Sequence, residues 1–315
     1  MAPNPEMSNL RDPVGRVLLT WSEPPKSVVA IINPKTRRTA DVVESVLRGA
    51  CPAGVDLIVR VSGSASEATE LARACAGACD LIVAAGGDGT VADVAAGLIG
   101  SGTPLGIMPA GSTNIVAQEL GIPPSLEASA ALFFRPHGLM RRDVGLCGDR
   151  IFLHMAGAGF DAHFFSRSDR ELKRKVGWLA YLPAAASALG EEPAQYRVTV
   201  DGEAIEAFAP LVVVANGGSV IRPELRIAPD VRADDGLFDV LVFTGSTPAA
   251  VVRTVAMFAT QRLAESPDVI WRRGVEVLLE SNPVMPIQLD GDVAATTPAL
   301  FRMMSLAVEL VVPLP

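Results

Sequence analysis

Strand-like and helix-like segments alternate along residues 27–120, and this alternation restricts the fold more than any other feature of the sequence. The strand-like runs are short and apolar, as expected for strands buried on both faces of a sheet. They are 28–33 (VVAIIN), 55–61 (VDLIVRV), 80–86 (DLIVAAG) and 105–109 (LGIMP). Apolar residues at helical spacing follow the strand-like runs, at 41–48, 66–78, 91–98 and 113–120. Such alternation requires crossover connections, so we predict an α/β domain with a parallel sheet between two helix layers.

The pattern changes near Pro136, after which strand-like runs dominate. Some are separated only by turn residues such as Asp201-Gly202, which favours antiparallel hairpins. The runs are 150–157, 195–202, 209–216, 236–243, 274–281, 285–292 and 306–312, with helical patterns at 167–189 and 248–262. We therefore predict three parts, which are an extended or loosely docked N-terminal arm (1–26), the α/β domain (27–136) and a β-rich domain (137–302). The last strand, within 303–315, could return to the α/β domain.

The composition excludes several classes of protein. A chain of 315 residues with 49% hydrophobic and 20% charged residues can form large cores and is not globally disordered. Its net charge of -8 argues against a nucleic-acid partner, because phosphate neutralisation needs clustered Lys and Arg. Four cysteines are too few for a disulfide framework, and neither a signal peptide nor a membrane span is visible. We expect a cytoplasmic protein.

The segment Gly86-Gly87-Asp88-Gly89-Thr90 stands where the third predicted strand ends and a helix begins. Glycines let backbone N–H groups approach an anion, and a helix N-terminus adds partial positive charge, with Thr90 as the expected cap. Such a turn suits a polyphosphate, provided that Asp88 acts through Mg²⁺ or on a hydroxyl. An ordinary glycine-rich turn is the alternative. The patterns G-x-x-x-x-G-K-[ST] and G-x-G-x-x-G are both absent.

Two further polar turns follow predicted strands. Residues 33–38 (NPKTRR) come after the first strand, and residues 109–114 (PAGSTN) after the fourth. Taken singly, Ser112, Thr113 and Asn114 are most simply explained as helix N-caps. In a parallel sheet, however, the carboxyl ends of the strands meet at one edge, where ligands bind in open α/β sheets. The three turns together therefore predict a phosphate-binding edge.

These motifs together resemble those of the diacylglycerol kinase catalytic-domain family, which includes bacterial lipid kinases and the sphingosine and ceramide kinases. The matching segments, in the family's order, are INP (32–34), GGDGT (86–90), PAGSTN (109–114), 212–240 and LDGD (289–292). GGDGT is shared with the NAD kinases, whereas its combination with APDVRADDGLFDV (228–240) and LDGD is specific to the lipid branch. The resemblance implies that 27–136 binds the nucleotide and that 137–302 is an antiparallel sandwich that binds the lipid.

The resemblance also implies roles for individual residues. ATP would contact Asn33, Pro34, Lys35, Thr36, Arg37, Ser62, Gly86, Gly87, Asp88, Gly89, Thr90, Val91, Ala92, Asp93, Gly111, Ser112 and Asn114. A structural Mg²⁺ would be bound at the DDG turn by Asp235 and by backbone oxygens of Arg232 and Leu237. Asp292 would be the general base, with Asp290 as its nearest competitor. Asp88 would share in catalysis, since Asp88 or Asp93 would help to hold Mg²⁺ on the phosphates.

Three segments depart from the family's usual pattern. Thr36-Arg37 stand in place of Ser-Gly, Ala92-Asp93 in place of Asn-Glu, and Asp292 in place of Glu. Asp93 and Asp292 still provide a carboxylate at these positions, so the chemistry stays feasible. The aspartate side chain is shorter than that of glutamate, so the distance that each carboxylate can span changes. A plain hairpin turn is the alternative explanation of LDGD, because Asp-Gly favours positive φ.

The leading hypothesis is therefore an ATP-dependent kinase that phosphorylates a lipid hydroxyl of the diacylglycerol, ceramide or sphingoid class. The alternatives are a soluble-substrate kinase of the NAD kinase type and a nucleotide- or lipid-binding homologue without turnover. Lys173-Arg174-Lys175 precedes an apolar aromatic segment at 176–182, which suits an anionic bilayer and a lipid tail, although a core helix with a solvated basic end fits equally well. We expect a lipid substrate and transient, peripheral contact with a membrane surface, and leave a homodimer open.

Overall fold

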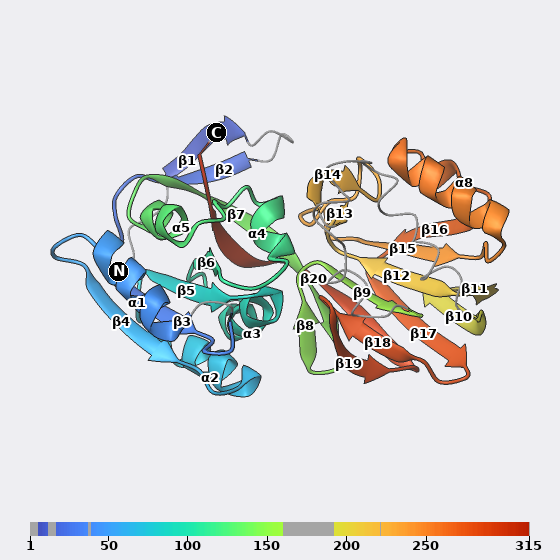
Figure 1. Ribbon diagram of the computed structural model, residues 1–315, viewed down its shortest axis with the longest axis horizontal. Helices are drawn as coiled ribbons and strands as arrows, with labels where there is room; N and C mark the ends of the chain where they lie inside the picture. Colours follow the sequence, from blue (N-terminus) through green and yellow to red (C-terminus); the bar gives the residue numbers. More distant parts are fainter. Residues whose placement is uncertain (1–5, 12–16, 37–38, 160–191, 221, 315) are drawn as a thin grey trace. The chain divides into compact units, whose positions relative to one another are not determined.

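The computed structural model describes residues 6–11, 17–36, 39–159, 192–220 and 222–314 (Figure 1). The chain forms two compact units, which are Met1–Arg142 with Leu306–Pro315, and Asp143–Ser305. The predicted helix at 167–189, with its basic cluster and aromatic segment, lies outside the described residues, as does Arg37.

The first unit contains a sheet in the order β1-β2-β7-β20-β6-β5-β3-β4. Parallel pairing joins β4, β3, β5, β6 and β20, which confirms the predicted parallel sheet. The strands are β1 (Glu6–Arg11), β2 (Val17–Trp21), β3 (Ser27–Ile32), β4 (Asp56–Val61), β5 (Leu81–Gly86), β6 (Leu105–Pro109), β7 (His137–Cys147) and β20 (Ala299–Val312). β5 and β6 are buried along their whole length, which explains why their sequences are continuously apolar.

Helices cover both faces of this sheet, as the strand–helix alternation predicts (Figure 1). They are α1 (Ala40–Ala50), α2 (Ala65–Cys75), α3 (Asp88–Leu98), α4 (Ile115–Glu119) and α5 (Leu126–Phe133). α1 and α5 pack together over one face, where Leu47 and Phe133 are fully buried. α2 and α3 pack against each other, and Gly97 allows the close approach, because a Cβ there would lie 2.4 Å from the Thr69 carbonyl oxygen.

Residues 17–21 of the predicted N-terminal arm form an extended strand that is docked on the sheet. β1 and β2 form an antiparallel pair, and β2 pairs with β7, with Trp21 opposite His137. Trp21 is buried and stacks on the His137 ring at a centroid distance of 6.0 Å. The prolines of this segment concealed the short apolar run that the sheet binds.

The second unit is a sandwich of two antiparallel sheets, as predicted. One sheet contains β10 (Ala194–Val200), β11 (Glu203–Ala209), β17 (Glu276–Asn282) and the start of β20. The other has the order β16-β15-β12-β9-β18-β19, formed by β9 (Met155–Ala158), β12 (Leu211–Ala215), β15 (Phe238–Phe243), β16 (Val269–Gly274), β18 (Pro286–Leu289) and β19 (Asp292–Thr296). Both sheets contribute to one core, in which Phe152 stacks on Phe238 at 5.7 Å and meets Phe301 edge-on at 6.1 Å.

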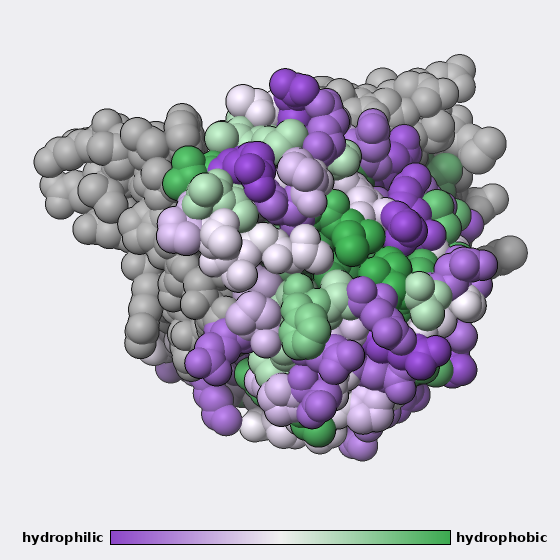
Figure 2. All heavy atoms as spheres, turned by 90° about the vertical axis from the view of Figure 1, so that its right-hand side faces the viewer, coloured by the Kyte–Doolittle hydropathy of each residue, from purple (hydrophilic) through white to green (hydrophobic). Residues whose placement is uncertain are grey.

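Smaller elements complete this unit. They are β8 (Arg150–Phe152), β13 (Ser219–Val220), β14 (Arg222–Arg226), α8 (Pro248–Ala259) and the 3₁₀ turn Leu263–Glu265. α8 lies on the outer face of the β12-containing sheet, where Val251 packs with Val213 and Leu241. The face shown in Figure 2 is mostly hydrophilic, with small groups of apolar side chains between the hydrophilic ones.

Candidate functional site

The three polar turns that follow β3, β5 and β6 are joined by hydrogen bonds. The side-chain amide of Asn33 donates to the Thr90 hydroxyl at 2.8 Å, and the backbone N–H of Asn33 donates to the Ala85 carbonyl at 3.1 Å. The backbone N–H of Ala110 donates to the Gly86 carbonyl at 2.9 Å. The Thr90 hydroxyl therefore accepts a hydrogen bond from the first turn. Contrary to the expectation, Thr90 does not cap α3. The cap is Gly87, whose extended backbone starts the helix at Asp88, three residues earlier than predicted.

Glycines let two of these turns touch through their backbones. A Cβ on Gly111 would lie 2.4 Å from the Gly87 Cα, and a Cβ on Gly86 would lie 2.5 Å from the Thr90 Oγ1. Real Cβ atoms do not approach other atoms so closely, so close packing requires glycine at both positions. The two turns form one continuous backbone surface at the edge of the sheet, and Gly87 and Gly89 remain partly accessible there.

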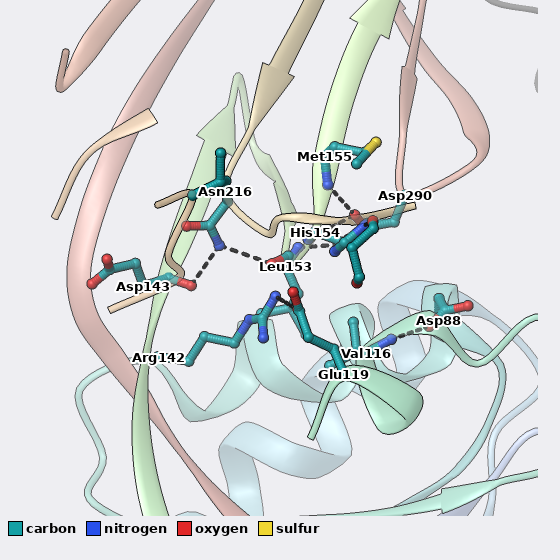
Figure 3. A network of polar contacts seen from close by, with 12 residues as sticks. Asp88, Val116, Glu119, Arg142, Asp143, Leu153, His154, Met155, Asn216 and Asp290 are labelled. Carbon is teal, nitrogen blue, oxygen red and sulfur yellow. Dashed lines mark hydrogen bonds and ion pairs between the residues drawn. The ribbon is translucent and has the colours of Figure 1, made fainter. Parts of the chain in front are cut away.

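Asp88 connects the turn after β5 to the helix after β6 (Figure 3). Its carboxylate accepts a hydrogen bond from the backbone N–H of Val116 at 3.2 Å, in the first turn of α4. Asn114 precedes that helix with a left-handed backbone, φ +50°, and its side chain both accepts from the Gly111 N–H at 2.9 Å and donates to the Gly111 carbonyl at 3.0 Å. These contacts fix the PAGSTN turn before any ligand binds.

The other end of α4 is held by a buried ion pair, which the sequence analysis missed. Arg142 on β7 donates to the Glu119 carboxylate at 2.8 Å, and the two side chains are 0% and 7% exposed (Figure 3). A carboxylate at the C-terminus of a helix is unfavourable unless a cation compensates it. No local pattern pairs residues this far apart, so the sequence held no signal for this contact.

The remaining residues predicted to contact the nucleotide fall into a buried group and an accessible group. Ser62 is buried, and its hydroxyl donates to the Ile32 carbonyl at 3.4 Å. Val91 and Ala92 have buried side chains and belong to the core of the unit. Residues whose side chains are at least partly accessible are Asn33, Pro34, Lys35, Thr36, Asp88, Asp93, Ser112 and Asn114. The accessible members provide hydroxyl, amide, amine and carboxylate groups around the glycine surface.

The LDGD segment of the second unit is a tight hairpin in which its two aspartates have different environments. Asp290 has φ +48° and Gly291 φ +99°, and they connect β18 to β19. The Asp290 carboxylate accepts from three successive backbone N–H groups of residues 153–155, at 2.7, 2.9 and 3.0 Å (Figure 3). Burial raises the pKa of Asp290, and these three donors oppose that shift. Asp292, by contrast, is exposed, so it is the more accessible of the two carboxylates.

The DDG turn does not fit the structural Mg²⁺ that the resemblance implies. One oxygen of Asp235 accepts from the Leu237 N–H at 3.1 Å, and the other pairs with the guanidinium of Arg273. Arg273 also contacts Asp239 at 3.1 Å. Within the residues that the structure describes, no cluster of three or more His, Cys, Asp or Glu side chains could hold a metal ion.

The same turn is bound from β7 by Asp143, which the sequence analysis also missed. The Asp143 carboxylate accepts from the Gly236 N–H at 2.7 Å, and its backbone N–H donates to the Ala233 carbonyl at 2.7 Å. The buried side chain of Asn216 donates to the carbonyls of Asp143 and Leu153, both at 2.8 Å (Figure 3). His154 is buried, and its ring forms a hydrogen bond with the Ser219 carbonyl at 2.7 Å.

None of the helices in the described part of the chain is both long and apolar enough to cross a membrane.

Comparison with known proteins agrees with this architecture. Residues 27–146 match the diacylglycerol kinase catalytic domain, and residues 154–312 match the YegS C-terminal NAD kinase beta sandwich-like domain. A probable lipid kinase YegS-like from Chromohalobacter salexigens is 33% identical over 273 residues, which cover 83% of this chain and 85% of that protein. An uncharacterized protein of Synechocystis is 31% identical over 234 residues, 72% of this chain and 54% of that protein, so this chain spans about half its length.

Among solved structures, a putative diacylglycerol kinase from Bacillus anthracis superposes with a TM-score of 0.72. The superposition covers 91% of this chain and 97% of the Bacillus anthracis chain, at 24% sequence identity. At this identity, the similarity establishes the fold alone. The two matched domains, an α/β domain followed by a β-sandwich, are those of diacylglycerol kinase-like proteins. The chain belongs to the diacylglycerol kinase catalytic-domain family, with a second domain of the YegS type.

Proposed function

We propose that this protein is an ATP-dependent lipid kinase that transfers the γ-phosphate of ATP to the hydroxyl of a diacylglycerol, ceramide or sphingoid acceptor. The observation that carries the proposal is the backbone contact between Gly87 and Gly111, which joins the GGDGT and PAGSTN turns into one surface of backbone groups. Backbone N–H groups and a helix N-terminus at such an edge suit a polyphosphate.

On the nucleotide side, the accessible polar groups around the glycine surface have distinct tasks. Lys35 is exposed beside the first turn and can neutralise phosphate charge, and the Ser112 hydroxyl can donate to a phosphate oxygen. When Mg²⁺ is bound together with ATP, it offsets the charge that develops on the transferred group. Asp88 and Asp93 are the carboxylates of this unit that we assign to that cation.

On the acceptor side, we assign Asp292 as the general base. It is exposed at the start of β19, whereas both oxygens of Asp290 are engaged by backbone donors. A base for the accepting hydroxyl contributes about 10²–10⁴-fold to such a reaction. Asp290 then acts through the hairpin, by fixing the turn from which Asp292 projects. Because the acceptors reside in bilayers, we also propose transient contact with a membrane surface.

The test is a phosphorylation assay with the full chain, Mg²⁺ and radiolabelled ATP. Acceptors are presented in mixed micelles, with diacylglycerol, ceramide and sphingosine in parallel and NAD in a separate reaction, and products are separated by thin-layer chromatography. We expect label on at least one lipid and none on NAD. Label on NAD alone would instead identify a soluble-substrate kinase.

A catalytically inert homologue is distinguished by Asp292→Ala. We expect this variant to retain the wild-type circular dichroism spectrum and ATP affinity while losing lipid phosphorylation. Absence of any phosphorylated lipid with the wild-type chain, despite ATP binding, would favour a binding protein without turnover.

A further inference from the structure

The acidic turn at residues 232–239 has its three carboxylates already paired with arginines. Asp234 accepts two hydrogen bonds from Arg232, at 2.9 and 3.0 Å. Asp235 and Asp239 share a single guanidinium, that of Arg273. Two guanidinium groups thus offset most of the negative charge of these three carboxylates, which would otherwise attract a divalent cation to this turn.

Strand register holds Arg273 at this place. In the antiparallel pair of β15 and β16, Arg273 is directly opposite Asp239, so their side chains lie on the same face. Trp271, two residues earlier and on that face, donates its indole N–H to Asp239 at 2.8 Å. Asp239 is only 1% exposed, and a carboxylate so deeply buried needs such partners.

Protein groups also fix the rest of the turn. Asp143 accepts from the Gly236 N–H at 2.7 Å, and Asp235 accepts from the Leu237 N–H at 3.1 Å. Gly236 has φ +75°, and a Cβ there would approach the Ser305 Oγ to 2.9 Å. The conformation of the turn is thus accounted for by contacts within the unit.

We propose that Arg273 is a built-in cation of the DDG turn, which replaces a structural divalent metal and makes the fold of the second unit independent of Mg²⁺ or Ca²⁺. A divalent ion bound to Asp235 would lie beside the guanidinium and be repelled by it. The proposal concerns this turn alone and stands apart from the substrate of the enzyme. It also leaves unchanged the requirement for Mg²⁺ that accompanies ATP.

The test is thermal unfolding of the full chain without nucleotide, in EDTA and in millimolar MgCl₂ or CaCl₂, with ionic strength matched by NaCl. We expect the Tm of the wild type to be the same in all of these conditions. Arg273→Met keeps the aliphatic stem but removes the charge, and we expect its Tm in EDTA to fall by about 3–6 °C. Because Asp235 and Asp239 then lack a cation, MgCl₂ or CaCl₂ should restore part of that loss.

Arg253→Met is the matched control, because Arg253 pairs with one carboxylate, Asp268, at 2.6 and 2.7 Å. Its Tm should fall without recovery in either salt. Should Arg273→Met fail to fold, Arg273→Lys retains a positive charge and should fold with no response to divalent ions. A saturable rise in the wild-type Tm with MgCl₂ or CaCl₂ that Asp235→Asn abolishes would overturn the proposal. A Tm of Arg273→Met equal to that of the wild type would also overturn the proposal.

Discussion

The carboxylate of Asp88 accepts a hydrogen bond from the backbone N–H of Val116, so a residue of the GGDGT turn caps the helix that follows the PAGSTN turn. That helix, α4, has five residues and is too short to be stable alone. Its other end is held by the Glu119–Arg142 pair. Asp88 therefore has a structural contact in addition to the catalytic role that we propose for it, and the two can be separated by mutation.

Asp88→Asn should separate the effect of the hydrogen bond to Val116 from the effect of the negative charge of Asp88. The asparagine oxygen can still accept from the Val116 N–H, so we expect the Tm to stay within about 2 °C of wild type. The negative charge near the phosphates is lost, and we expect kcat for lipid phosphorylation to fall by about 100-fold or more. Asp88→Ala should lose both properties, with an additional loss of about 1 kcal/mol in the free energy of unfolding. Full activity in Asp88→Asn would mean that Asp88 serves only as a cap.

Gly111→Ala should damage the nucleotide site through the backbone. The new Cβ would lie 2.4 Å from the Gly87 Cα, and no rotamer change can relieve a contact with backbone. We expect the Kd for ATP to rise by about tenfold or more and the free energy of unfolding to fall by about 1–3 kcal/mol. Isothermal titration with ATP and urea denaturation measure the two effects.

Gly49→Ala is the control for this substitution. Gly49 lies within α1, and a Cβ there meets no atom within 4 Å. Alanine favours the helix by about 0.5–1 kcal/mol, so this variant should be slightly more stable, with unchanged ATP binding. If both glycine variants bind ATP normally, the close packing of the two turns is not needed for the nucleotide site.

Much of the fold could be predicted from local pattern. The buried parallel strands β3, β5 and β6 are continuous apolar runs, and their expected and observed bounds differ by a single residue at most. Helix starts were less predictable, because α3 begins within the glycine turn itself, at Asp88. The strand β2 was missed because its five residues give too weak a periodicity beside several prolines.

For the candidate site, the sequence allowed prediction of the turns that form it but not of the residues that hold those turns in place. Motif and strand order indicated which turns meet, and Asn33 does bond Thr90. The partners that hold those turns could not be found in this way. Arg142 and Glu119 are 23 residues apart, and Arg273 and Asp235 are 38 apart. Such pairs follow from sheet register and tertiary packing, which a single sequence does not display.

Asp290 and Asp292 should show opposite effects when each is changed to asparagine. Asp290→Asn puts an amide donor where an oxygen accepts from backbone N–H groups, and we expect it to lower the free energy of unfolding by about 2–4 kcal/mol. Asp292 is exposed, so Asp292→Asn should change stability by no more than about 0.5 kcal/mol. It should nevertheless lower kcat by about 10²–10⁴-fold.

Urea denaturation and the lipid phosphorylation assay on the same preparations provide both measurements. The reverse pattern, with Asp292→Asn unstable and Asp290→Asn stable but inactive, would assign the base to Asp290.

His137 should make the stability of the first unit depend on pH. Its ring is 2% exposed, stacks on Trp21 and donates from Nδ1 to the Arg135 carbonyl at 2.8 Å. Burial lowers the pKa of His137 below its ordinary value of 6.5, and the hydrogen bond to the carbonyl only partly opposes this. As the pH falls through 6.5, the unfolded chain binds a proton that the folded chain does not, so stability decreases.

The comparison that isolates this effect is with His137→Phe, which keeps an aromatic ring against Trp21 but cannot titrate. We expect the free energy of unfolding of the wild type, from urea denaturation between about pH 7.5 and pH 5, to fall more steeply than that of the variant. The difference between the two slopes is bounded by one proton, about 1.4 kcal/mol per pH unit. His154 is present in both proteins and therefore does not contribute to this difference. Parallel curves would show that His137 takes up its proton equally in the folded and unfolded states, which its burial argues against.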